Sequence, residues 1–349
     1  MSIAVHKQKQ YLHLIMGLIV LLMCVVFVSF YMGRFSRVDL AKIPLILLDQ
    51  IIPLSNPTWT TIEERVIISL RLPRIIAAVI VGASLAVSGV SFQLLFYNPV
   101  ASPDTLGVTS SASCGAVLAI LLGLGAFAIK LTSFVTGCAA VLFVLFFATK
   151  LSKGQNMTVY LILVGMVVSA LFSAMMSIMK FIADPTTQLP QITYWLMGSF
   201  ANVTVKDLPY CVLFFAFGIV PLFLLRWRMN LLSLSEYEAR SMGENVTSLR
   251  IITVVCATLL TSSSVAMTGG ISWVGLVIPH IARLLVGNDA RKLLPVSALM
   301  GSSFLLLMDD LSRSLTAAEI PISILTSLFG APVFFALLIK KKDRFSNGN

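Results

Sequence analysis

The chain has 349 residues, of which 58% are hydrophobic and only 11% are charged, and its mean hydropathy is +0.95. Because a soluble domain carries about 25% charged residues, this composition excludes a soluble globular protein. It predicts a single integral membrane domain over residues 1–349. The net charge of +10 does not indicate a nucleic-acid partner, since the basic residues lie at the ends of apolar segments, where membrane topology explains them.

Motifs for catalysis, metal binding and nucleotide binding are missing from the sequence. The five cysteines lie in apolar runs without a CxxC pair, which is typical of small buried side chains. The three histidines form no H-E-x-x-H pattern, and there is no G-x-x-x-x-G-K-[ST] sequence. We therefore expect no metal, no cofactor and no enzymatic activity in this chain, and any ATP hydrolysis must reside on a partner.

Apolar segments with helical patterns fill nearly the whole length, and a bilayer crossing takes about 20 residues. They predict an all-α polytopic membrane protein with about ten transmembrane helices. Residues 33–62 are expected to form a polar loop, and 194–200 a re-entrant or interfacial piece, because Trp and Tyr favour that depth. The predicted spans are 11–32, 66–89, 105–124, 131–149, 158–182, 208–225, 251–267, 274–286, 296–308 and a tenth from 321 to 340.

The distribution of lysine and arginine predicts that both termini lie inside, because most basic residues then fall on the inner side. Three arginines, Arg71, Arg74 and Arg313, nevertheless fall at the outer ends of spans. Two interpretations stay open at this point. These side chains could anchor the protein to lipid phosphates, or they could form a docking surface for an acidic partner.

Small residues recur every four positions along the predicted span 158–182. They are Gly165, Ser169, Ser173 and Ser177, and this spacing places them on one face of a helix. The stripe could be a packing seam for a neighbouring helix. It could equally be one wall of a polar conduit.

Residues 226–250 form the longest charged segment in the interior of the chain. Glu236 and Arg240 are spaced i, i+4, which suits a short surface helix, and Gly243 is placed to end it. The segment could be a solvated connector or a docking element for a cytoplasmic partner.

A short internal echo favours a transporter. Residues 89–92 (GVSF) resemble 270–273 (GISW), and a proline follows each glycine after nine or ten positions. One copy falls at the inner end of its span and the other at the outer end. Opposite orientations are what an inverted repeat predicts.

Several long motifs, in order, resemble one known family. They are LRLPR (70–74), GASLAVSG (82–89), NPVASPDTLG (98–107), GGISWVGLVIPHIARLLVG (269–287), RKLLP (291–295) and EIPISILTSLFGAPVFFALL (319–338). This pattern, which covers about residues 65–340, is similar to the FecCD family, the permease subunits of ABC importers for iron–siderophores, cobalamin and haem.

The resemblance implies a type II ABC importer permease in the bacterial cytoplasmic (inner) membrane. Such a subunit forms a homodimer or heterodimer around a central path, binds ABC ATPase subunits inside, and receives substrate from a periplasmic or lipid-anchored binding protein. Arg71, Arg74 and Arg313 match arginines that grip acidic residues of the binding protein. The coupling segment, residues 230–250, resembles the part of the family that docks on the ATPase, and the positions concerned are Glu238, Ala239, Arg240 and Gly243. It departs from the E-A-A-x-x-x-G pattern in two ways, because an arginine stands at the third place and lies only three residues before Gly243.

The resemblance also implies that span 158–182 lines the path, with Thr158 near a cytoplasmic gate. We expect the cargo to be a ferric siderophore, with cobalamin or haem as alternatives. A proton-coupled secondary transporter is a rival of another class, but it requires a carboxylate in mid-span. Asp309, Asp310 and Glu319 lie near span ends, so they do not fit that role.

Overall fold

The computed structural model describes residues 2–33, 38–39, 41–50, 52, 58–152, 157–234, 236–316 and 318–346. All regular structure in these ranges is helical, which confirms the predicted all-α class. The elements are α1 (Ser2–Tyr31), α2 (Lys42–Asp49), α3 (Thr61–Arg65), the π-helical η1 (Val66–Arg71), α4 (Leu72–Leu95), η2 (Pro103–Leu106), α5 (Val108–Leu121), α6 (Ala126–Ser152), α7 (Met157–Ile182), α8 (Gln188–Leu196), η3 (Val205–Asp207), α9 (Leu208–Leu224), α10 (Arg226–Met229), η4 (Asn230–Ser233), α11 (Glu236–Ser241), α12 (Val246–Thr268), α13 (Val274–Val286), α14 (Ala290–Ser314) and α15 (Ile322–Ser346).

Seven helical stretches in the described ranges are long and apolar enough to cross a membrane. Three shorter apolar helices, α5, α13 and the first part of α15, coincide with the other predicted spans. Helix α5 has 14 residues, about 21 Å at 1.5 Å per residue, whereas the hydrocarbon core is about 30 Å thick. The polytopic membrane architecture is confirmed, and the count of ten crossings stays a prediction.

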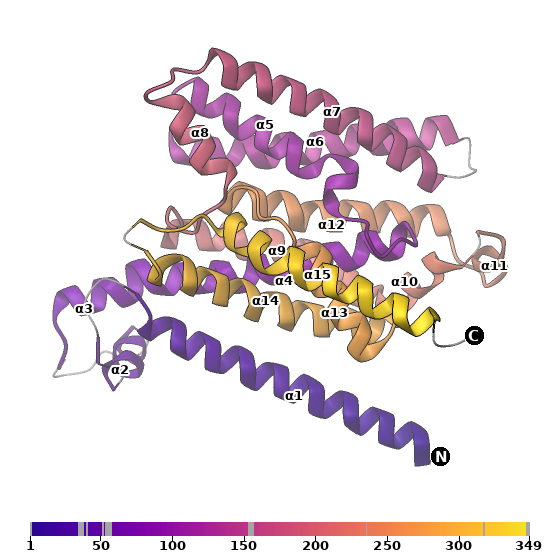
Figure 1. Cartoon of the computed structure of the whole chain (residues 1–349), viewed down its shortest axis with the longest axis horizontal. Coiled ribbons are helices and arrows are strands. Elements are labelled where there is room, and N and C mark those ends of the chain that lie inside the picture. The colour runs from indigo at the N-terminus through magenta and orange to yellow at the C-terminus, as the bar shows by residue number, and fades with distance from the viewer. Residues whose placement is uncertain are drawn as a thin grey trace.

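The long helices run side by side, as Figure 1 shows. The start of α1, the end of α15 and the short helices α10 and α11 lie at one end of the bundle, whereas α2 and α3 lie at the other. Following the orientation that the charges predict, we call these the inner end and the outer end. Both ends of the chain lie at the inner end, which agrees with an even number of crossings.

Two helices form the centre of the bundle. We compare the buried share of residues in the most apolar window of each spanning stretch. It is 83% for the stretch that ends in α4 and 72% for α12, whereas it is only 17% for α1, α7 and α9. The small side chains of α4 explain its position, because in lipid close helix packing depends on small residues. The peripheral helices leave their apolar side chains for lipid or for another subunit.

Helices α4 and α14 approach most closely where two glycines face each other. A Cβ atom on Gly82 would overlap the carbonyl oxygen of Gly301, and a Cβ on Gly301 would overlap that of Gly82. The two backbones are therefore in direct contact, and any larger residue at either position must push the helices apart.

Hydroxyl groups join α4 to α12 in the centre. The Ser88 hydroxyl donates to the Ala257 carbonyl oxygen at 3.0 Å and lies 2.7 Å from the Thr261 hydroxyl. All three residues are buried. Such hydrogen bonds stabilise helix contacts in a medium that offers no water to polar groups.

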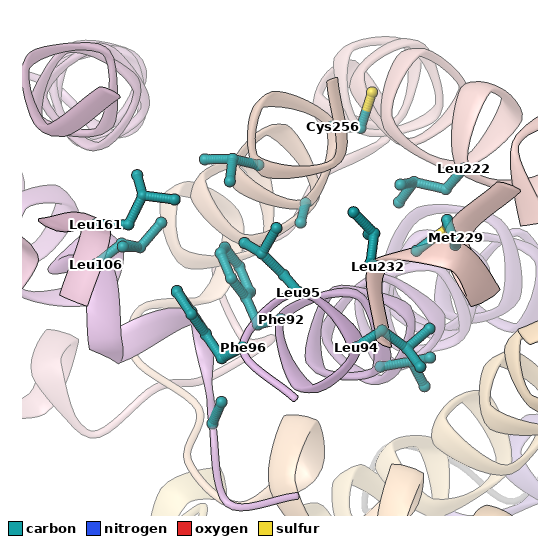
Figure 2. Close-up of a cluster of buried hydrophobic side chains, with 14 of the residues drawn as sticks. Phe92, Leu94, Leu95, Phe96, Leu106, Leu161, Leu222, Met229, Leu232 and Cys256 are labelled. Atoms are coloured by element: carbon teal, nitrogen blue, oxygen red, sulfur yellow. The ribbon is translucent and has the colours of Figure 1, made fainter. Parts of the chain in front are cut away.

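A hydrophobic cluster at the inner end connects the core to the coupling segment. Phe92 and Phe96 of α4 stack with their ring centroids 6.0 Å apart. Figure 2 shows side chains around these rings that come from α7, α9, α10 and η4: Leu161, Leu222, Met229 and Leu232. The short helices before α11 are thus packed on the transmembrane core.

The structure differs from the sequence expectations at several boundaries. Helix α1 begins at Ser2, well before residue 11, and the predicted loop 33–62 contains α2 and the start of α3. Helix α3 begins after Thr60, whose hydroxyl accepts from the Glu63 backbone amide while the Glu63 side chain accepts from the Thr60 amide. This capping box starts a helix outside the apolar run, where hydropathy gives no signal.

The internal echo does not correspond to two copies of one local structure. Residues 89–92 lie within α4, whereas 270–273 lie outside any helix and immediately precede α13. The inverted repeat therefore stays a prediction, which rests on the opposite orientations expected for the two spans.

The glycine contact between α4 and α14 gives a first prediction. Gly301→Ala should lower the free energy of unfolding by about 1–3 kcal/mol, because the added methyl group overpacks a backbone contact. Gly17→Ala in α1 is the matched control, since a Cβ there meets nothing within 4 Å. Thermal unfolding in detergent measures both variants, and equal melting temperatures would contradict the close contact.

Candidate functional site

Arg74 lies at the outer start of α4 and is held by two carboxylates. Its Nη2 is 2.7 Å from Oδ1 of Asp309 in α14, and its Nη1 is 2.9 Å from Oε1 of Glu319, just before α15. Its Nε donates to both oxygens of Asp309 at 2.9 Å. Charge-assisted, bidentate contacts of this kind are the strongest hydrogen bonds in proteins, so this arginine ties three segments together.

A second group of contacts ties α1 to the same place. Arg313 of α14 forms an ion pair with Asp310 and donates to the backbone carbonyl oxygen of Ser29 at 2.7 Å. The Ser29 hydroxyl donates to Asp310 at 2.7 Å. Arg71 donates to the carbonyl oxygen of Phe30. We call Arg71, Arg74, Asp309, Asp310, Arg313 and Glu319 the outer ion-pair cluster.

The outer ion-pair cluster is neutral overall, because three arginines face three carboxylates. Arg71, Arg74 and Arg313 are only 4%, 8% and 6% exposed. In this structure all three are therefore buried rather than part of an open cationic surface, and Arg74 and Arg313 are internal ion-pair partners. Their role in docking a binding protein stays a prediction. Sequence reasoning noted the acidic residues only as span ends, although Arg313 follows Asp309 and Asp310 at the i, i+4 and i, i+3 spacings that favour a pair on one helix.

The coupling segment at the inner end is fixed by polar contacts. The Arg228 Nε donates to Oε2 of Glu244 at 2.8 Å. The Asn230 side chain donates to Asp289 at 2.9 Å and accepts from the Ala290 amide at 2.7 Å. Sequence reasoning did not single out Asn230 or Asp289, because nothing local shows that they meet.

Two carboxylates at this inner end are held in their charged form. Hydrogen bonds from Arg228 lower the pKa of the Glu244 carboxyl. Hydrogen bonds from Arg291 and Asn230 lower the pKa of the Asp289 carboxyl to about 2. Both groups therefore remain ionised at neutral pH, and the polar contacts of the coupling segment persist there.

Helix α11 covers Glu236–Ser241, as the spacing of Glu236 and Arg240 predicts. Ala239 is completely buried on the core, whereas Glu238 is exposed. Gly243 follows with φ +80, the left-handed conformation expected where a glycine ends a helix. Ser235 lies outside the described residues. One side of α11 thus packs on the bundle, and the side that carries Glu238 faces outward.

The small-residue stripe of α7 divides into two halves. Gly165 packs against the backbone of 105–106, where a Cβ would overlap the Thr105 carbonyl oxygen. The Ser169 hydroxyl lies 3.1 Å from the Ser110 hydroxyl of α5. Ser173 and Ser177 are exposed. The inner half therefore packs on η2 and α5 within this chain, whereas the outer half is open. The role of all four residues in lining a path stays a prediction.

Thr158 lies in the first turn of α7, at the inner end, and is half-buried. Its role at a gate stays a prediction. No group of three or more His, Cys, Asp or Glu side chains that could hold a metal occurs in the described parts of the chain.

A cavity of about 200 Å³ lies between α4, α12 and the segments that precede α5 and α13. It is level with Leu85 in the middle of α4 and with Thr261 in α12. Asp104 and Trp273 line it. Sequence reasoning quoted Asp104 only as part of a helix start, because its depth in the bundle cannot be read from the sequence.

This arrangement defines a class of protein. An apolar helical bundle with polar clusters at both ends, and a cavity with polar lining at the level of the bilayer centre, is the build of a membrane transport protein. Comparison with known proteins then gives the family. Residues 8–340 match the FecCD transport family, and the chain belongs to it, which confirms the resemblance that the motifs indicated.

Individual relatives are similar over most of the chain. The molybdate import system permease protein MolB of Haemophilus influenzae is 40% identical over 336 residues, covering 96% of this chain and 98% of that protein. A permease of Helicobacter pylori, described as part of an iron chelatin transport system, is 41% identical over 277 residues, covering 79% and 83%. A solved metal-chelate type ABC transporter, in an inward-facing conformation, is 39% identical with a TM-score of 0.82, covering 93% and 98%. The type II importer permease fold is thereby confirmed.

The outer ion-pair cluster gives a second prediction. Arg74→Ala should lower the free energy of unfolding by about 3–5 kcal/mol, because Asp309 is fully buried and would lose its nearer cationic partner, leaving only Arg313 at 3.7 Å. Adding Asp309→Asn should recover part of the loss. Arg291→Ala, which removes an exposed ion pair at the inner end, is the control and should change the melting temperature little. Equal effects of the two arginine variants would contradict the assignment.

The divided stripe gives a third prediction. Ser169→Leu should lower the melting temperature, because Ser169 touches Ser110 and the backbone of Gly107. Ser173→Leu should leave the melting temperature unchanged because the side chain is exposed, and it should reduce uptake if the outer half lines the path. Thermal unfolding and transport are measured on the same preparations. Full uptake by the Ser173→Leu variant would show that this residue does not line the path.

Proposed function

We propose that this chain is the permease subunit of an ABC importer that carries a ferric siderophore inward. The observation that carries the proposal is the placement of two polar elements at opposite ends of one bundle. The outer ion-pair cluster lies at the start of α4, whereas α11 lies at the inner end of the bundle (Figure 1). A permease without an ATP site must receive substrate on one side and ATPase contacts on the other.

Iron chelates are the favoured cargo among those that FecCD proteins carry. The iron chelatin permease and the metal-chelate type transporter support this choice. The similarity to a molybdate permease over nearly the whole chain makes an oxyanion the main competing cargo. Cobalamin and haem remain alternative cargoes, which would be imported by the same ATP-driven mechanism.

We assign the outer end to a periplasmic or lipid-anchored binding protein. Because Arg74 and Arg313 are engaged by internal carboxylates and Arg71 donates to the Phe30 carbonyl oxygen, an acidic residue of the binding protein must either exchange with one of these partners or contact the cluster at its rim. Glu319 is the most accessible of the three carboxylates, with 29% of its side chain exposed. Exchange would begin at the Arg74–Glu319 pair.

We assign the coupling segment to a cytoplasmic ATPase. Glu238, Ala239, Arg240 and Gly243 lie in or after α11, which packs on the core through Ala239. A push from the ATPase on α11 would therefore reach α4 through Met229 and Leu232. A second permease, identical or not, would pair with this chain, and Ser173, Ser177 and Thr158 would face the path between the two.

Reconstitution tests the function. Proteoliposomes that contain the permease with its ATPase are supplied with the external binding protein. They should take up a radiolabelled ferric siderophore only when ATP is present on the side of the membrane where the ATPase is bound. Uptake of molybdate, cobalamin or haem in its place would identify a different cargo. Uptake that persists without the ATPase would instead indicate a secondary transporter.

Glu238→Arg tests the ATPase assignment in the same system. Reversing this exposed charge should reduce co-purification of the ATPase and abolish ATP-dependent uptake while the protein still inserts and melts normally. Asp184→Asn, an exposed outer-loop position, is the matched control and should leave co-purification intact. Full ATPase binding by the Glu238→Arg variant would exclude α11 from the contact.

A further inference from the structure

We propose that Asp104 selects the charge of the cargo, so that the path admits cationic and neutral ferric chelates and disfavours oxyanions and strongly anionic chelates. The inference rests on the proposed function and deepens it by naming the substrate class. It comes from the cavity between α4, α12 and the segments before α5 and α13, where Asp104 is the one charged side chain among the described lining residues.

The position of Asp104 is unusual for a carboxylate. It is exposed to the cavity, yet the cavity lies level with Leu85, near the middle of the membrane-spanning helix α4. A carboxylate at that depth is costly unless it is paired or hydrated. The acidic residues of the outer ion-pair cluster are paired with arginines, whereas the cavity offers Asp104 no basic lining residue.

The surroundings of Asp104 leave its charge directed into the cavity. The Thr109 side chain hydrogen-bonds to it, and the other polar lining groups are hydroxyls: Ser102, Thr261 and Ser272. Hydroxyl groups solvate a charge without neutralising it. The ionised form of Asp104 makes the local field negative, and its effect on a passing ion is larger than in bulk water because the cavity walls have a low dielectric constant.

The backbone holds Asp104 rigidly. Ser102 and Thr105 form a capping box at the start of η2, and Gly107 turns the chain into α5 with φ +75. Gly165 of α7 presses directly on 105–106. Because the turn is packed in this way, its backbone keeps Asp104 at the cavity, so an anionic cargo would meet a repulsive charge there.

An aromatic ring shares the cavity. Trp273 lines it with a left-handed backbone, φ 72, and its ring lies 6.3 Å from that of Phe334 in α15. A non-glycine residue in this conformation is strained and persists only where the surroundings fix it. A tryptophan and a carboxylate that line one cavity suit a cationic group, because an aromatic ring and a negative charge both attract positive charge.

One chain provides only part of the binding volume. The cavity measures about 200 Å³, whereas pockets for drug-sized ligands measure about 300–1,000 Å³. A ferric chelate would therefore fill more than this cavity, and in the proposed dimer a second permease subunit would supply the rest of the enclosure. In a dimer of identical chains two copies of Asp104 would act on the same cargo.

A set of chelates that differ only in charge gives the test. A ferric trihydroxamate with one free amine is cationic, its acetylated form is neutral, and its succinylated form is anionic. Initial uptake of each is measured in proteoliposomes with the ATPase and the same binding protein. The binding protein's own preference then cancels when wild type and variant are compared.

Asp104→Asn should lower the ratio of cationic to anionic uptake about tenfold, the change expected when one charge near the cargo is removed. Asp104→Glu should keep the wild-type ratio, and Asp184→Asn in the outer loop should not change it. Asparagine can still accept the hydrogen bond from Thr109, so a merely structural role of Asp104 would leave the ratio unchanged. That result would overturn the inference.

A second measurement needs no variant. The wild-type permease–ATPase complex, without binding protein, should bind the cationic chelate more tightly than the anionic one in equilibrium dialysis, and equal affinities would contradict the inference. The proposed function fails separately. If wild type carries molybdate and none of the ferric chelates, both ideas fall. If it carries the chelates with a ratio that is independent of residue 104, only the charge selection falls.

Discussion

Pairing of charge inside an apolar bundle is the constraint on which this structure depends. Lipid offers no water to an ionised group, so each buried arginine must meet an acceptor from the protein. Arg74 meets Asp309 and Glu319, and Arg313 meets Asp310 and Ser29. Because these partners lie on different elements, the same contacts that satisfy the charges also fix α1, α4, α14 and the start of α15 at the outer end.

The two ends of the bundle carry charge in different ways. At the outer end the ions are buried and balanced, so an external partner must compete with internal pairs. At the inner end the pairs Arg228–Glu244 and Arg291–Asp289 are partly exposed, and they hold the coupling segment without burying it. Between them, Asp104 faces a cavity whose described lining has no basic residue. The charges that join helices at the two ends are thus paired, whereas Asp104 has no basic residue beside it in the described lining of the cavity where we propose that the cargo passes.

Sequence patterns predicted local features of the candidate site well. The i, i+4 pair and the following glycine located α11, because both signals act within one helix. Periodicity also placed Gly165, Ser169, Ser173 and Ser177 on one face of α7. It could not show that Gly165 and Ser169 pack on η2 and α5 while Ser173 and Ser177 remain exposed, because what a face touches depends on other helices.

The sequence by itself determined the membrane class, the all-α fold and the FecCD family, because hydropathy, helical period and motif order are properties of neighbouring residues. Only the tertiary structure decided that Arg74 is paired, since its partner Asp309 is 235 positions away along the chain. It alone also placed Asp104 at the level of the middle of α4. The depth of a loop and the partner of an ion depend on how helices pack, and local composition does not encode either one.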